Sequence, residues 1–138
     1  MNVHSKKISI KTNGNSDIID ITEDVKAILS DTCIEDGIAT VFVTGSTGAI
    51  TTIEYEPGLV EDMRNALDRL IPEGIGYKHD LRWGDGNGHS HIRASFLGPS
   101  LTVPFIGGHL QLGTWQQIIF IDLDNRPRSR DILVHIIG

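Results

Sequence analysis

Residues 116–123 read QQIIFIDL, and residues 37–44 read GIATVFVT. Both segments contain short, continuous apolar runs that are rich in β-branched side chains, and turn-forming residues lie beside them. Runs of this kind are typical of buried strands. We therefore predict that these two segments are strands in the core of a β-rich domain.

Weaker strand signals flank these two runs. They lie in residues 3–12, 17–21, 49–55, 101–106, 109–112 and 132–137. Asn13-Gly14-Asn15 is a turn signal, because Gly and Asn tolerate a positive φ, and it predicts an opening hairpin between the first two segments. Gly107-Gly108 predicts a second hairpin in the same way.

Two segments carry clear helix signals. Thr22 is a good N-cap, with Glu23 and Asp24 in the first turn, and this helix should end near Cys33. The second helix follows Pro57, has apolar residues at three- and four-residue spacings, and should end before residue 72.

Two further segments give less regular signals. Residues 92–97 predict at most a short third helix, and residues 74–88 show almost no periodicity. The predicted fold is therefore α+β over residues 1–138 as one domain. It consists mainly of antiparallel β-sheets packed as a sandwich, with two or three helices.

The composition excludes several classes of protein. Hydrophobic residues make up 39% of the 138 residues and charged residues 22%, as in a folded domain. The net charge of −6, without a basic cluster, disfavours a nucleic-acid partner. No segment has the apolar length of a signal peptide or a membrane span, so we expect a cytoplasmic protein with no membrane partner. The single Cys33 precludes an intrachain disulfide.

Three of the six histidines, His79, His89 and His91, lie within thirteen residues of one another, with Asp80 among them. Imidazoles and a carboxylate form a plausible catalytic metal site with an open position. The alternative is a surface loop that carries histidines by chance. On a regular helix, His89 and His91 would point about 200° apart, so shared ligation requires a strand, a loop or a cap. Asp80 and Glu54 are the candidate acid or base, although Glu54 is equally well explained as a solvated strand end.

Two further features are candidate substrate contacts. Arg128 and Arg130 are two residues apart on an extended segment, so they share a face that suits a phosphate. The alternatives are a solvated sheet edge, or pairing with Asp122 or Asp124. Trp115 is either a core residue or a stacking wall for a heterocycle.

Several motifs together resemble the YjbQ-like family over nearly the whole chain. They are Thr51–Glu54, Tyr77–Asp80, Asn87–His91, Leu97–Pro104, Leu112–Gln116 and Arg126–Arg130. The resemblance implies a small α+β protein that forms homotrimers, with a metal-binding histidine pocket near subunit contacts. Arg82 and Trp83 depart from the pattern, because family members tend to be more acidic there.

Some members of that family carry the name secondary thiamine-phosphate synthase. The resemblance thus implies a transferase that joins a pyrimidine-methyl diphosphate to a thiazole phosphate. Its expected contacts to this small phosphorylated substrate are Asn87, Thr114, Trp115, Gln116, Arg128 and Arg130. Histidine ligands favour zinc, whereas a diphosphate substrate favours magnesium. The alternatives are a zinc-type hydrolase of a small phosphorylated compound and a non-catalytic trimer that binds a metal or ligand.

Overall fold

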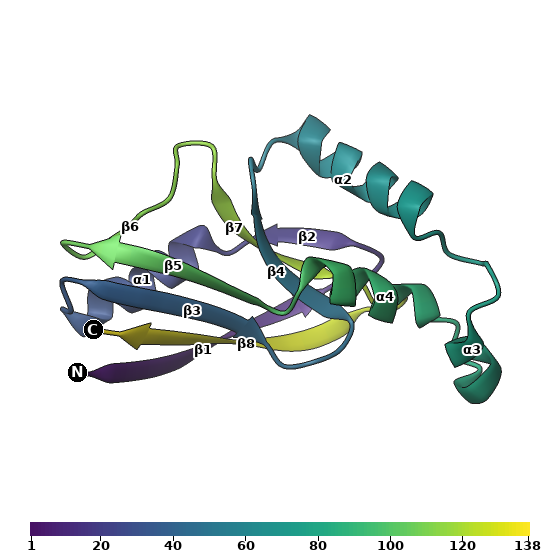
Figure 1. Ribbon diagram of the computed structural model, residues 1–138, viewed down its shortest axis with the longest axis horizontal. Coiled ribbons are helices and arrows are strands. Elements are labelled where there is room, and N and C mark those ends of the chain that lie inside the picture. The colour runs from purple at the N-terminus through teal and green to yellow at the C-terminus, as the bar shows by residue number, and fades with distance from the viewer.

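The computed structural model describes residues 1–138, which form two antiparallel sheets and four helices (Figure 1). The strands are β1 (Val3–Thr12), β2 (Asp17–Asp20), β3 (Gly37–Val43), β4 (Gly48–Ile53), β5 (Ser100–Ile106), β6 (His109–Leu110), β7 (Gln117–Asp122) and β8 (Arg128–Ile137). The helices are α1 (Thr22–Thr32), α2 (Pro57–Leu70), α3 (Lys78–Trp83) and α4 (Gly88–Leu97). One sheet has the strand order β1-β8-β3-β5-β6, and the other has the order β2-β7-β4. The predicted α+β class with mainly antiparallel sheets is confirmed.

Strand β7 is the centre of the smaller sheet, and it is buried on both faces. Ile118 and Phe120 pack into a large core shared with α1 and the five-stranded sheet. Ile119 and Ile121 pack into a second core shared with α2 and α4. All four side chains have no exposed surface, and full burial of such a side chain contributes about 1.5–3 kcal/mol. The continuous apolar run is therefore explained by two cores that meet at one strand.

The two helices expected from the sequence are present. Helix α1 buries Val25, Ile28 and Leu29, and it ends where Cys33 adopts a left-handed conformation with φ 55°. Helix α2 begins where the Glu56 carboxylate accepts hydrogen bonds from two backbone N–H groups. Its amphipathic pattern buries residues on one face only, against the smaller sheet. No helix of the chain combines the length and the apolar character needed to cross a membrane.

The predicted opening hairpin is wrong. Strand β1 pairs along its whole length with β8, whereas β2 pairs with β7 in the other sheet. The turn between them does need Gly14, which has φ +71° and lies so close to the carbonyl oxygen of Arg126 that a Cβ would clash. This turn passes the chain from one sheet to the other instead of joining two partners. The second predicted hairpin is confirmed, because β5 pairs with β6.

The five-stranded sheet has one face that no helix covers. Its inward side chains belong to the large core, but Ile38 and Phe42 on the outer face are 40% and 38% exposed. A shallow hollow of about 200 Å³ lies there, lined by Thr40, Phe42, Leu133 and His135. An apolar surface of this kind is where contacts with other chains are expected.

Candidate functional site

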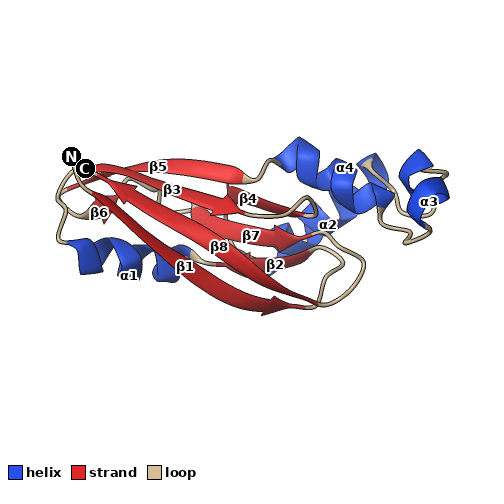
Figure 2. Ribbon diagram, turned by 90° about the horizontal axis from the view of Figure 1, so that it is seen from below, coloured by secondary structure: helices blue, strands red, loops and turns tan.

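The candidate site lies in α3, in the first turn of α4 and in the loop between them. These elements form the end of the molecule that is remote from both chain termini (Figures 1 and 2). Helix α3 buries none of its residues, and Gly84 ends it with φ 67°. Helix α4 begins at Gly88 rather than at residue 92 as predicted, so His89 and His91 are helical.

Gly88 brings the start of α4 against α3. Its backbone N–H donates a hydrogen bond to Oδ1 of Asp80 at 2.9 Å. A Cβ at this position would lie 2.6 Å from the Cβ of Tyr77 and 3.1 Å from Asp80 Oδ1. Only glycine permits this approach without displacing a neighbour. The predicted catalytic residue Asp80 is thereby held at the centre of the site.

Three donor side chains converge beside this contact. One ligand atom from each of His79, Asp80 and Asp85 lies within 4.8 Å of the other two. Nδ1 of His79 is 3.4 Å from Asp80 Oδ1 and 3.5 Å from Asp85 Oδ1. The ring of His91 lies alongside, with its centroid 4.5 Å from that of His79. We refer to His79, Asp80 and Asp85 as the donor group.

His89 occupies a different environment. It is only 2% exposed, its Nδ1 has no hydrogen-bond partner, and its ring lies 6.4 Å from the Tyr77 ring. Burial lowers the pKa of His89, and the nearby Arg93 adds to that effect. Because residues two apart on a helix point in different directions, the structure brings His91 to His79 and turns His89 inward. The predicted set of three histidines is thus divided.

The turn that follows β7 holds this loop in place. Nδ2 of Asn87 donates to Asp124 Oδ1 at 3.3 Å, while the Asn87 Oδ1 atom is buried without a partner. Nδ2 of Asn125 donates to the backbone carbonyl of Asp85 at 2.8 Å. The turn after β7 therefore positions both ends of the segment that carries Asp85. Asp85 was not assigned a role in the predicted site, although the sequence places it among the three histidines, between two glycines.

Arg128 and Arg130 share a face, as predicted, and both approach Asp124. Nη1 of Arg128 lies 2.6 Å from an Asp124 oxygen, and the Arg128 side chain is 33% exposed. Arg130 is buried and binds both carboxylate oxygens of Asp122. Burial alone would raise the pKa of Asp122, but hydrogen bonds from Arg130 and Thr12 outweigh it, so the pKa is lowered. The alternative of pairing with Asp122 and Asp124 is thus the one that the structure shows, and of the two predicted phosphate contacts only Arg128 has an accessible edge.

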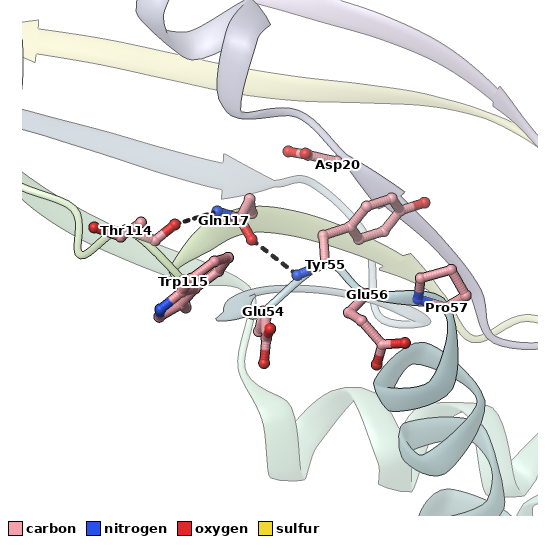
Figure 3. A pocket seen from close by; sticks show the side chains of 8 residues that line it. All are labelled: Asp20, Glu54, Tyr55, Glu56, Pro57, Thr114, Trp115 and Gln117. Carbon is pink, nitrogen blue, oxygen red and sulfur yellow. Dashed lines mark hydrogen bonds between the residues drawn. The ribbon is translucent and has the colours of Figure 1, made fainter.

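The remaining predicted residues lie elsewhere. Glu54, Thr114 and Trp115 line a cleft of about 400 Å³, together with Asp20, Tyr55, Glu56, Pro57 and Gln117 (Figure 3). Gln116 is turned away, because its side chain bonds Gly113 and Thr52. The cleft is at the Gln117 end of β7, roughly 17 Å of strand from the Asp122 end near the histidines. We name it the Trp115 cleft. In one chain, Glu54 therefore does not join the donor group.

The donor group has the chemistry of a divalent-cation site. One imidazole and two carboxylates from α3 and the following loop offer mixed nitrogen and oxygen ligands, which suit zinc and other divalent ions. The ring of the neighbouring His91 makes no hydrogen bond within the chain and lies beside that of His79. The residues present thus fit a bound ion.

Comparison with known proteins gives one consistent family. A family model described as UPF0047 protein YjbQ-like matches residues 6–138. A UPF0047 protein of Methanothermobacter thermautotrophicus is 40% identical over 138 residues, covering 100% of this chain and 94% of the relative. The YugU protein of Bacillus subtilis, also a UPF0047 protein, is 36% identical over 135 residues, covering 96% and 98%.

Solved structures agree with the fold. The crystal structure of a YbjQ-like protein of unknown function from Sulfolobus solfataricus superposes with a TM-score of 0.94 at 36% identity, covering 99% of this chain and 98% of that chain. A YjbQ/UPF0047 protein from Clostridium acetobutylicum gives a TM-score of 0.88 at 38% identity, covering 96% and 99%. Each of these matches covers nearly the whole of both chains.

Proposed function

The chain belongs to the YjbQ-like UPF0047 family, and we propose that it is a metal-dependent enzyme whose reaction centre is the donor group. The observation that carries this proposal is the convergence of His79, Asp80 and Asp85 within 4.8 Å. The two carboxylates repel each other at this separation, and a cation held between them and the imidazole would relieve that repulsion. A divalent ion would satisfy all three.

The substrate class we propose is a small phosphorylated compound. A divalent ion at such a site supplies a Lewis acid that polarises a phosphoryl oxygen. Arg128 offers a partly accessible guanidinium at this end of the sheet, where it is bound to Asp124 and its side chain is 33% exposed. It can donate a further hydrogen bond to a phosphate, whereas Arg130 is buried and bound to Asp122.

Two residues are suited to move a proton at this centre. Asp80 accepts a hydrogen bond from the N–H of Gly88, which fixes one of its oxygens and leaves the other free. His91 is partly exposed beside His79, and its ring is free of hydrogen bonds within the chain. Formation of thiamine phosphate from its two phosphorylated halves is the named reaction that we propose to assay first. Zinc-type hydrolysis of a small phosphate ester is the second, favoured by the imidazole ligand.

Elemental analysis of the purified protein tests the proposal. We expect close to one divalent ion per chain in the wild type. The ion should be lost in His79→Ala and in Asp85→Asn, and retained in His4→Ala, which removes an exposed histidine of β1. The proposal of a metal-dependent enzyme would be overturned by equal metal content in all four proteins, or by a wild type that binds no divalent ion on titration. Activity on phosphorylated substrates is then assayed with the ion that binds.

We also propose that the protein assembles as a homotrimer through the uncovered face of the five-stranded sheet. Support comes from the exposed apolar side chains Ile38 and Phe42 on that face and from the family resemblance. Light scattering coupled to size exclusion should give three times the 15.1 kDa chain mass. Phe42→Arg should lower that mass, whereas Phe96→Arg, at an 80% exposed position of α4, should not. A monomeric wild type would contradict the assembly.

A further inference from the structure

We propose that the Trp115 cleft is a binding site for a small organic cation of the alkylammonium class, such as a quaternary ammonium group. This site lies at the opposite end of β7 from the donor group and does not depend on a metal ion. This binding site is separate from the proposed function at the donor group. Thr114 and Trp115 were expected to contact a phosphorylated substrate, and we now assign the cleft that they line to a cation.

The aromatic wall of the cleft is the first observation. Trp115 is 72% exposed and Tyr55 is 42% exposed, although both stand over a hollow of about 400 Å³. That volume suits a small molecule. The indole N–H of Trp115 makes no hydrogen bond within the chain. A large aromatic side chain left in water beside a cavity, without a core to fill, is typical of a stacking surface.

The wall is held rigid by a single side chain. Oε1 of Gln117 accepts a hydrogen bond from the backbone N–H of Tyr55 at 2.8 Å, and its Nε2 donates to the carbonyl of Thr114 at 3.2 Å. Figure 3 shows these two bonds linking the segments that carry Tyr55 and Trp115. The Tyr55 hydroxyl also donates to the carbonyl of Ile18 at 2.9 Å. A ligand thus meets a pre-organised surface, which reduces the entropy lost on binding.

The charge of the lining selects the ligand class. Three carboxylates line the cleft, on Asp20, Glu54 and Glu56, and no lysine, arginine or histidine does. Asp20 is bonded to Thr22 and Glu56 caps α2. The carboxylate of Glu54 makes no hydrogen bond or ion pair within the chain. Glu54 and Trp115 both line the cleft, close to the pair Ile53–Gln117 where β4 and β7 meet (Figure 3).

An unpaired carboxylate and an exposed aromatic ring in the same cleft give three kinds of ligand different binding energies. A phosphate or carboxylate ligand would meet uncompensated negative charge. A neutral apolar ligand would gain only the contact with the rings. An organic cation gains both the carboxylate and the negative face of the indole. Two basic side chains, Lys26 and Arg64, line hollows that adjoin the cleft, and both have partners elsewhere. Lys26 lies 3.3 Å from a carboxylate oxygen of Glu23, and Nε of Arg64 donates to the carbonyl of Ser16 at 2.9 Å.

Choline and its neutral isostere 3,3-dimethylbutan-1-ol provide a matched pair of probes, because they differ in one charged nitrogen. The chain has two tryptophans, so Trp83→Phe leaves Trp115 as the only indole reporter. In this background we expect choline to change the fluorescence of Trp115 with a saturable, millimolar dissociation constant. The isostere should bind about tenfold more weakly or not at all.

Variants then locate the site. Glu54→Gln preserves the shape of the side chain and should weaken choline binding about fivefold or more, while Glu61→Gln, on the exposed side of α2, should not. Trp115→Leu, followed by calorimetry, should abolish binding. Circular dichroism shows whether each variant is folded. If Trp115→Leu does not fold, Glu54→Gln still tests the site.

Three results would overturn the proposal. They are no binding of choline up to about 100 mM, equal binding of choline and its isostere, and equal binding by the Glu54→Gln variant. Metal content is measured on the same samples. A protein that binds the metal but not choline counts against the Trp115 cleft alone. A protein that binds choline but not the metal counts against the donor group alone.

Discussion

Arg130 and Asp122 form a two-point ion pair that joins the two sheets of the molecule. Nε and Nη2 of Arg130 donate to the two carboxylate oxygens of Asp122 at 2.8 and 2.9 Å. Asp122 ends β7 in the smaller sheet, and Arg130 lies in β8 of the larger one. Both side chains are buried, and Nη2 of Arg130 also donates to Thr47 at 2.6 Å. Because both groups are shielded from solvent, water would not solvate either charge if its partner were removed.

Removing one member of this pair should therefore be costly. Arg130→Met keeps much of the side-chain volume but leaves the Asp122 carboxylate buried without its cation, and we expect a loss of about 3–5 kcal/mol in the free energy of unfolding. Arg126→Met, at an exposed position of the preceding turn, is the matched control and should change it by less than about 0.5 kcal/mol. Urea denaturation gives both values. A similar loss in the two variants would mean that this ion pair contributes no more to stability than an exposed arginine does.

The same pair predicts acid sensitivity. The pKa of Asp122 is lowered despite its burial, because Arg130 and Thr12 bond the charged form. A carboxyl group whose pKa is lower in the folded state stabilises the protein fully above its unfolded pKa, near about 4. That stabilisation is lost as the pH falls through the folded value. We expect the urea midpoint to decline below about pH 4. In Asp122→Asn, which is less stable at pH 7, the decline should be shallower. Parallel curves would contradict this assignment.

The sequence predicted the parts of the fold that depend on local pattern. Residues 118–121 were recognised as buried because every side chain in the run is apolar, and α2 because its apolar spacing and Pro57 agree. The pairing of β1 and β2 was not predictable in this way. Gly14 shows where the chain turns but not which strands become neighbours, and the partners of β1 and β2 lie about a hundred residues further along the chain. Long-range pairing is decided by the shared core.

The site was predictable in composition but not in geometry. The sequence located His79, Asp80 and His91 in one segment, and the structure brings these side chains together. It missed α3 because that helix buries no residue, so no apolar period marks it. It also missed the early start of α4, because glycine is a poor helix former and only the contact of Gly88 with Asp80 and Tyr77 explains its use there. His89 was grouped with the other histidines on the expectation that residues 89–91 are not helical. In the helix that the structure shows, residues i and i+2 do not share a face.

The contact at Gly88 gives a direct test of how the site is positioned. In Gly88→Ala, the added Cβ lies 2.6 Å from the Cβ of Tyr77, so α4 must move away from Asp80. We expect a loss of about 1–3 kcal/mol in stability and weaker metal binding. Gly76→Ala is the control, because a Cβ there meets nothing within 4 Å. Thermal unfolding and metal titration of both variants provide the measurement. Wild-type behaviour of Gly88→Ala would show that the close approach is not required.

The division between His89 and His91 predicts two opposite phenotypes. His89 is 2% exposed, so His89→Ala opens a cavity and should cost about 1–3 kcal/mol of stability, while the bound ion is retained because His89 lies outside the donor group. His91 is partly exposed beside His79, so His91→Ala should leave stability within about 0.5 kcal/mol of the wild type and weaken metal binding. Urea denaturation and metal titration of the two single variants separate these effects. If His89→Ala instead loses the ion and keeps its stability, the three histidines act as one ligand set, and the ion must draw His89 out of the interior.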